Sequence, residues 1–242
     1  MLVFLSILPL VLPLGLAAGA LTTIAGLGGG MMLVLVFSLL WDVPTALAVS
    51  APALLLGNLH RVWLFRRSVD RRLAKSLALG ALPASFLGGL FAVAAPVWVL
   101  HWLLVATTAF AVAKKLGLVT LSQQPRAMVP VGIGAGFLTA TSGGGGLMVA
   151  PVLLASGLRA EAYVATGAVT AVAMHIGRIG AYGFGGLIDG ESLLTSLALA
   201  VAIIFGNALG KGARPLMSEG TKLRIAWGAM ASAVALALAG VT

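Results

Sequence analysis

Long apolar stretches separated by short polar connections dominate the chain. Uninterrupted apolar windows occur at residues 44–65, 73–95, 97–116, 160–182, 191–210 and 223–241. A helix needs about 20 residues to cross the hydrocarbon core of a bilayer, so each window is long enough to span a membrane. The sequence lacks the short alternating segments that a transmembrane β-barrel requires. The pattern therefore predicts an all-α integral membrane protein.

Two further apolar windows, 2–40 and 128–156, are interrupted by glycine, at residues 26–30 and 143–146. Basic residues flank the window 128–156 on both sides, so it is expected to enter and leave the membrane on one face. Two full crossings would need roughly 40 residues, which is more than this window has. We therefore predict a re-entrant helical hairpin that turns at the glycines, where positive φ is tolerated. The window 2–40 predicts a similar hairpin entered from the other face, giving about eight helical segments in all.

An internal repeat relates the two halves. At an offset of 117 residues, "GLAAGALTTIAGLGGGMM" from Gly15 aligns without gaps with "GIGAGFLTATSGGGGLMV" from Gly132. The repeat predicts a first unit at residues 1–116, a second at 128–242 and a linker at 117–127, all within one membrane unit. Because Gly15 and Gly19 belong to the repeated motif, we expect the N-terminal apolar stretch to be retained rather than removed as a signal peptide.

The charge pattern predicts that the two repeats are inverted. The connection 66–75 carries five basic residues, whereas its counterpart at 183–191 carries two acidic residues and no basic one. The next pair reverses the bias, since 94–97 is neutral and 211–224 is basic. By the positive-inside rule, the connections 66–75, 114–126, 158–160 and 211–224 face the cytoplasm, and those at 40–44, 94–97 and 183–191 face outside. Corresponding connections of the two halves thus lie on opposite sides of the membrane.

The amino-acid composition limits which cofactors and partners the chain is expected to bind. The chain is 60% hydrophobic, has a mean hydropathy of +1.11 and contains no cysteine. Its three histidines are scattered, so no metal site and no cofactor are expected. The formal net charge of +9 comes from short juxtamembrane connections and does not predict nucleic-acid binding. We expect the partners to be the lipid bilayer and a small anionic substrate, and the sequence leaves open whether the chain forms a homo-oligomer.

Of the 15 Lys and Arg residues, 13 lie in the connections assigned to the cytoplasm. The other two, Arg61 and Arg178, are repeat mates inside apolar helices, where a charged side chain needs a partner or ligand. A guanidinium offers a planar fork for oxyanions. Asn58 and His175 precede these arginines by three residues and share their helix faces. Two alternatives remain at this stage: Arg61 snorkels to the inner interface, and His175 is a packing donor.

The two interrupted helices supply further candidates for an anion site. Helix N-termini attract anions through unpaired amides and the positive end of the helix dipole, and hydroxyls beside the breaks add donors. The alternative is that the glycines serve only close helix packing. The predicted substrate-binding residues are Arg61, Arg178, Asn58, His175, Thr22, Thr23, Gly26, Gly28, Gly29, Thr139, Thr141, Ser142, Gly143, Gly144, Gly145 and Gly146.

These motifs resemble the TauE/SafE family of sulfite exporters. The resemblance rests on the repeated glycine-threonine hairpin, the basic inner connections and the repeated helix-borne arginine, and it covers nearly the entire chain. It implies movement of sulfite, a sulfonate or another small sulfur anion across the bacterial inner membrane. The first hairpin reads "AGLGGG" and the second "TSGGGG", so the resemblance does not decide whether both halves contribute equally to the site.

The leading interpretation is a multi-pass secondary transporter, not an enzyme, that moves a small anion by alternating access between inverted halves. No GxxxxGK[ST] run is present in the sequence, which disfavours ATP-driven transport by this chain. An anion channel is the nearest alternative, because channels also use broken helices. A less favoured one is an intramembrane serine hydrolase with Ser142 as nucleophile and His175 as base.

Overall fold

The computed structural model describes residues 2–26, 28–115, 118, 128–218, 220–222, 224, 225, 228 and 231. Its regular elements are helices, and five of them are long and apolar enough to cross a membrane. The protein is therefore an all-α multi-pass membrane protein. In order, the elements are α1 (Leu2–Ala25), α2 (Gly29–Leu40), α3 (Val43–Leu64), η1 (Arg66–Ser68), α4 (Arg71–Ala94), α5 (Val97–Lys115), α6 (Met128–Ser142), α7 (Gly146–Ala155), α8 (Ala160–Phe184), α9 (Gly190–Ala213) and η3 (Arg214–Leu216).

Both predicted helix breaks are present. α1 ends at Ala25 and α2 begins at Gly29, while α6 ends at Ser142 and α7 begins at Gly146. Gly26, Gly28 and Gly143 have φ of 81°, 98° and 73°, which side chains with a Cβ rarely adopt. At 1.5 Å per residue, α2 rises about 18 Å and α7 about 15 Å, roughly half the 33 Å of α3. Both breaks therefore lie near the middle of the bundle.

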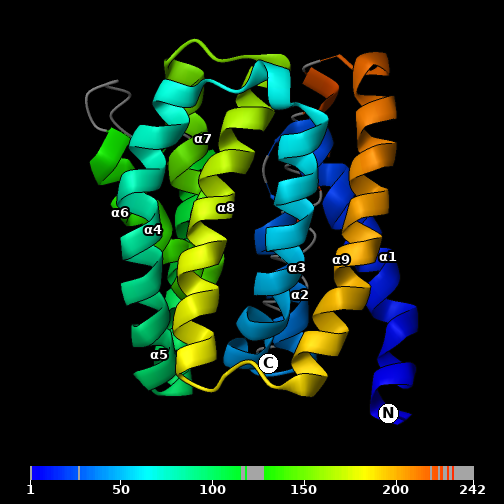
Figure 1. The fold of residues 1–242 in the computed structure, drawn as a ribbon, viewed down its shortest axis with the longest axis vertical. Coiled ribbons are helices and arrows are strands. Elements are labelled where there is room, and N and C mark those ends of the chain that lie inside the picture. The colour runs from blue at the N-terminus through cyan, green and yellow to red at the C-terminus, as the bar shows by residue number, and fades with distance from the viewer. Residues whose placement is uncertain are drawn as a thin grey trace.

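The helices run between two ends of an elongated bundle (Figure 1). α1 packs along α9, and α4 packs along both α6 and α8. Glycines permit these close approaches, since a Cβ at Gly19 would overlap the backbone of Ile203 and one at Gly136 the backbone of Ala81. The pair α1 with α9 corresponds, at the repeat offset, to α6 with α4. The structure thus has the pairing of helices that a duplication would produce. The inversion of the two repeats stays a prediction.

Three aspartates begin helices at the ends of the bundle. Asp42, Asp70 and Asp189 are the N-caps of α3, α4 and α9, and each side chain accepts a hydrogen bond from the backbone amide three residues later. Such a cap satisfies an amide that has no partner within the helix. The hydrogen bonds from Ser192 lower the pKa of the exposed Asp189 carboxyl, so this cap stays charged and effective until the pH falls below the usual range of an aspartate.

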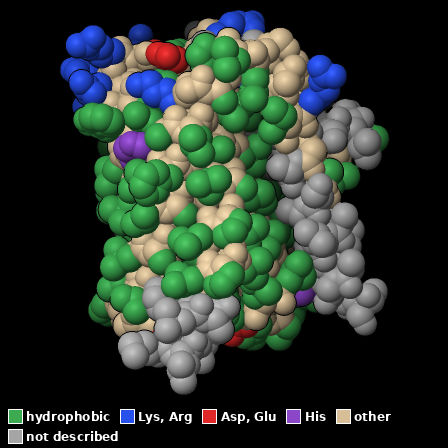
Figure 2. Space-filling model, turned by 90° about the vertical axis from the view of Figure 1, so that its right-hand side faces the viewer, with side chains coloured by type: hydrophobic (Ala, Val, Ile, Leu, Met, Phe, Trp, Pro, Cys, Tyr) green, Lys and Arg blue, Asp and Glu red, His purple; other side chains and the backbone are tan. Residues whose placement is uncertain are grey.

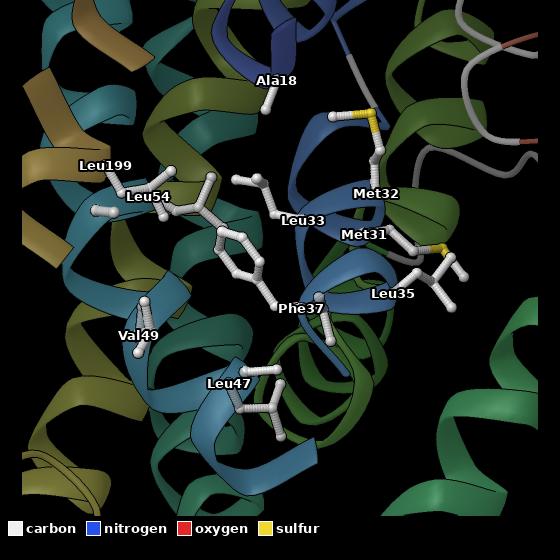
Figure 3. Close-up of a cluster of buried hydrophobic side chains, with 14 of the residues drawn as sticks. Ala18, Met31, Met32, Leu33, Leu35, Phe37, Leu47, Val49, Leu54 and Leu199 are labelled. Atoms are coloured by element: carbon white, nitrogen blue, oxygen red, sulfur yellow. The ribbon is translucent and has the colours of Figure 1, made fainter. Parts of the chain in front are cut away.

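The hydrophobic core surrounds the short helix α2. Met31, Met32, Leu33, Val34 and Leu35 are all buried, so this part of α2 is covered on every side and not along one stripe. Figure 3 shows α2 side chains beside those of Leu54 from α3 and Leu199 from α9. The broken helix is thereby held inside the protein, which is where non-helical backbone at membrane depth is tolerated.

The two ends of the bundle differ in charge. On the face shown in Figure 2, Lys and Arg side chains gather at one end. This end includes η1, the start of α4 and the start of α8, and the opposite end carries Asp42, Asp189 and Glu191. The linker 117–127 and the window 223–241 lie largely outside the described residues. The assignment of the basic end to the cytoplasm stays a prediction.

Cysteine labelling tests this topology without background labelling of native thiols, because the sequence has no native cysteine. We expect Arg67→Cys to react with an impermeant maleimide in inside-out vesicles and Glu191→Cys to react in right-side-out vesicles. Both positions are exposed. Equal labelling of the two positions from one side would show that these connections share a compartment and that the halves are not inverted.

Candidate functional site

A cavity of about 100 Å³ lies between the two helix breaks. Its walls come from both hairpins and from α3 and α8, which cross the bundle in opposite directions. The volume is roughly that of three water molecules at liquid density, so the cavity suits a small solute. The lining includes Thr22, Gly26, Gly28, Gly30, Met31, Leu54, Asn58, Arg61, Thr139, Gly143, Gly144, Gly146, Leu147, Tyr163, Met174, His175 and Arg178.

Arg61 reaches into this cavity from α3. Its side chain is only 6% exposed, so it does not extend along the surface to the lipid headgroups. One terminal nitrogen donates to the carbonyl oxygen of Thr22 at 3.0 Å, and the other donates to Oδ1 of Asn58. Thr22 lies in the last turn of α1, at the negative end of the helix dipole, and its carbonyl oxygen also accepts from the amide of Gly26 at 2.8 Å. Arg61 therefore ties α3 to the broken end of the first hairpin.

Arg178 makes the equivalent contact from α8. It is fully buried, and one terminal nitrogen donates to the carbonyl oxygen of Thr139 at 3.1 Å, in the last turn of α6. The other donates more weakly to Oγ of Ser50 at 3.4 Å. Thr22 and Thr139 are repeat mates, as are the two arginines. Each arginine thus holds the C-terminal end of one broken helix.

Three buried polar atoms at the cavity have no hydrogen-bond partner. They are the hydroxyl of Tyr163, Nδ1 of His175 and Nε of Arg178. A buried polar group without a partner costs about 1–3 kcal/mol, and more if it is charged. Within the described part of the chain, no Asp or Glu lines the cavity, which holds two guanidinium groups. The Tyr163 hydroxyl and Arg178 Nε–H are donors, so the arrangement lacks acceptors for these two groups and lacks negative charge.

The N-terminal ends of α2 and α7 also face the cavity. Gly30 and Met31 from α2, and Gly146 and Leu147 from α7, belong to its lining. The amides of Leu147 and Met32 donate to the carbonyl oxygens of Gly144 and Gly28, so these ends act on the cavity as the positive ends of helix dipoles. Two such ends meet at one cavity together with two arginines. This combination favours a bound anion.

The hydroxyls beside the breaks are already engaged. Thr22 Oγ1 donates to the carbonyl of Ala18 at 2.7 Å, and Thr139 Oγ1 donates to that of Ala135 at 2.8 Å. Their protons are therefore used within their own helices in this structure. The donors left for an anion are guanidinium, tyrosine and backbone N–H groups, together with His175 when Nδ1 carries a proton.

Five of the predicted residues lie outside the cavity lining, namely Thr23, Gly29, Thr141, Ser142 and Gly145. Thr23 donates to Oδ1 of Asn207 at 2.9 Å, and Thr141 donates to the carbonyl of Phe137. Gly29 and Gly145 pack so closely against neighbouring helices that a Cβ would overlap Ala18 or Ala135. These residues position the hairpins in this structure.

The hydroxyl of Ser142 forms hydrogen bonds with residues other than His175. This hydroxyl lies 2.9 Å from Oγ1 of Thr107 and 3.0 Å from the carbonyl oxygen of Leu138. His175 lines the cavity, which Ser142 does not. The geometry therefore gives no support to a pair in which His175 activates Ser142.

Sequence reasoning missed Tyr163 and Arg214. Tyr163, from the first turn of α8, packs its ring against Gly26. Arg214 was counted only as a topological charge, but it is 6% exposed and donates to the carbonyl oxygens of Thr23 and Ile24 at the end of α1. A tyrosine in an otherwise apolar helix was a signal for the first. Nothing in the sequence marked Arg214 as buried.

The model of the family described as "Sulfite exporter TauE/SafE" matches residues 11–238 of the chain. The match covers both helix breaks, both arginines and every lining residue named above. Neither a curated protein nor a solved structure matches the chain.

Proposed function

Since the chain belongs to the sulfite exporter TauE/SafE family, we propose that it is a secondary transporter that binds a small sulfur oxyanion in the central cavity and exports it across the bacterial inner membrane. Membership implies a transporter of sulfite or a related sulfur compound in a multi-pass membrane protein. The identity of the anion, the inner-membrane location and the transport mechanism are the parts that we propose.

One observation carries this proposal: three buried polar atoms without partners share a cavity with two arginines and, among the described residues, no carboxylate. An oxyanion supplies both the missing acceptors and the missing charge. Its oxygens would accept from Arg178 Nε–H and the Tyr163 hydroxyl. Asn58 and His175 would orient the anion, which would lie close to the positive ends of the α2 and α7 dipoles.

The charge of the cavity favours a dianion. Each break brings one helix C-terminus and one helix N-terminus to the site. The partial charges of these two termini, about 0.5 each, are opposite in sign and largely cancel. The two guanidinium charges then remain, and leaving a buried charge unpaired is costly. A dianion such as sulfite or thiosulfate neutralises both. The small cavity also suits these solutes better than a large organic sulfonate.

The arrangement of the two halves supports transport by alternating access. Each arginine joins a hairpin to a long helix, and the two hairpins meet at the cavity. Rocking of one half against the other would open the cavity first to one face and then to the other. A channel remains the second candidate, because broken helices and positive helix ends also line pores.

Reconstituted transport distinguishes these functions. Liposomes containing the protein and loaded with unlabelled sulfite are expected to accumulate external labelled sulfite transiently by counterflow, because a carrier exchanges bound solute across the membrane. Methanesulfonate, a monoanion, is expected to support at least tenfold less counterflow. Rapid equilibration without counterflow would indicate a channel, and no protein-dependent flux of any sulfur anion would refute the proposal.

Tyr163→Phe tests the role of the unpartnered hydroxyl. A hydrogen bond to a charged group is worth about 1.5–3 kcal/mol, so the variant is expected to raise the KM for sulfite about tenfold or more. The melting temperature of the anion-free protein should not fall, since the hydroxyl has no partner to lose. A clear loss of stability with unchanged KM would instead assign Tyr163 a structural role.

A further inference from the structure

A second hollow lies at the basic end of the bundle, away from the central cavity. It is a groove of about 370 Å³ formed by the end of α3, the connection through η1, the start of α4 and one side of α8. Its lining consists of Val62, Arg66, Val69, Arg71, Ala74, Lys75, Ala78 and Val169. In Figure 1 the connection from α3 to α4 crosses over the end of α8. None of these lining residues belongs to the anion site.

The groove is amphipathic. Its floor is made of valine and alanine side chains, and its basic residues are Arg66, Arg71 and Lys75, all exposed. Arg71 and Lys75 are four residues apart and therefore share one face of α4. Asp70 and Glu161 lie nearby but are not part of the lining; Asp70 accepts from the amide of Leu73 and Glu161 accepts from the hydroxyl of Ser68.

Arg66 is held in place by Trp63. Its guanidinium lies 5.6 Å from the centre of the Trp63 ring and donates to the Trp63 carbonyl oxygen at 3.0 Å. Trp63 is 60% exposed, and Leu79 on α4 is 62% exposed, so the apolar side of the groove opens toward the acyl chains of the bilayer. Tryptophan beside basic residues is typical of the membrane–water interface.

We propose that this groove is a binding site for an anionic phospholipid of the inner leaflet. The phosphate is placed among Arg66, Arg71 and Lys75, and an acyl chain lies over the valine and alanine floor. A basic pocket between helices at the cytoplasmic interface has the chemistry that recognises anionic headgroups. The opposite end of the bundle offers no match, since its connection at 94–97 is neutral and that at 183–191 is acidic.

Three variants of the full-length protein distinguish lipid binding in this groove from general attraction to the basic surface. Arg71→Gln with Lys75→Gln removes two basic residues of the groove. Arg67→Gln with Arg72→Gln is the matched control, because these exposed neighbours are not part of the lining. Ala78→Phe keeps every charge but fills the floor, at a half-buried position next to the exposed Leu79.

The measurement is retention of phosphatidylglycerol by detergent-purified protein in native mass spectrometry, with phosphatidylcholine of the same acyl chains as reference. Wild type and the Arg67/Arg72 control are expected to retain one phosphatidylglycerol molecule in preference to phosphatidylcholine. The Arg71/Lys75 variant should bind it about 30-fold more weakly, as expected for two basic residues at about 1 kcal/mol each. Ala78→Phe should bind it at least tenfold more weakly.

Three results would overturn the lipid site. Equal losses in the Arg71/Lys75 variant and its control would show that attraction is spread over the surface. Full retention by Ala78→Phe would show that no acyl chain occupies the floor. Competition by glycerol 1-phosphate as effective as that by phosphatidylglycerol would identify a site for a soluble phosphate.

Discussion

Replacing Arg178 with glutamine is expected to reduce sulfite transport by at least about 30-fold. Arg178 is fully buried, lines the cavity and has a free Nε–H. Removing one partner of a buried charge interaction costs about 2–5 kcal/mol, and 2 kcal/mol corresponds to the 30-fold loss. The same variant should no longer be stabilised by sulfite in a thermal unfolding assay of the purified protein.

Two further variants separate charge from geometry at this position. Arg178→Lys keeps the positive charge but loses the planar fork, so we expect transport between that of the wild type and Arg178→Gln. Ser50→Ala removes the 3.4 Å contact with Arg178 and a hydrogen bond to the carbonyl oxygen of Leu47 within α3, and we expect near-normal transport. An Arg178→Gln protein that folds and transports sulfite at the wild-type rate would remove this arginine from the site.

In the run of four glycines, Gly145→Ala is expected to destabilise the protein while Gly146→Ala does not. A Cβ at Gly145 would overlap Thr139 Oγ1 and the carbonyl oxygen of Ala135, whereas a Cβ at Gly146 has no atom within 4 Å. Overpacking of this kind costs about 1–3 kcal/mol. We therefore expect a lower melting temperature and strongly reduced transport for Gly145→Ala, measured on purified protein and in liposomes.

Gly146→Ala serves as the matched control, since it changes an adjacent residue by the same single methyl group. Its free energy of unfolding should change by less than about 0.5 kcal/mol. The added methyl enters the cavity lining, so any effect should appear in the KM for the anion. Equal destabilisation by the two substitutions would mean that the α6–α7 hairpin is not packed as described.

The helical spans and the two breaks were predictable because each depends on local sequence. The window 44–65 became α3 at Val43–Leu64, and the glycines at 143–146 separate α6 from α7. Apolar length determines a membrane span, and only glycine adopts positive φ readily. The repeat offset likewise paired Arg61 with Arg178, which line one cavity.

Long-range contacts could not be predicted in the same way. Spacing along a helix shows which residues share a face, but not which helix that face meets. Arg214 therefore counted as a loop charge, although it donates to the carbonyls of Thr23 and Ile24 on α1. Asn207 was missed for the same reason, because its partners Thr23 and Gly57 lie on two other helices.

The threonine hydroxyls show a different limit of sequence reasoning. Their positions beside the breaks indicated donors for an anion, and Thr22 and Thr139 do line the cavity. In the structure both hydroxyls donate to carbonyls four residues earlier. A threonine hydroxyl within a helix can always donate to a carbonyl oxygen of the preceding turn instead of to a ligand. The sequence does not show which of these acceptors it uses.

The proposed transporter binds its oxyanion between Arg61 and Arg178. A crystal structure of the protein with selenite would reveal this site, because selenium gives an anomalous signal and the shape and charge of selenite resemble those of sulfite. We expect one anomalous peak in the central cavity, with selenite oxygens within hydrogen-bond distance of Arg178 Nε and the Tyr163 hydroxyl. An empty cavity at a selenite concentration that saturates transport, with the signal elsewhere, would contradict it.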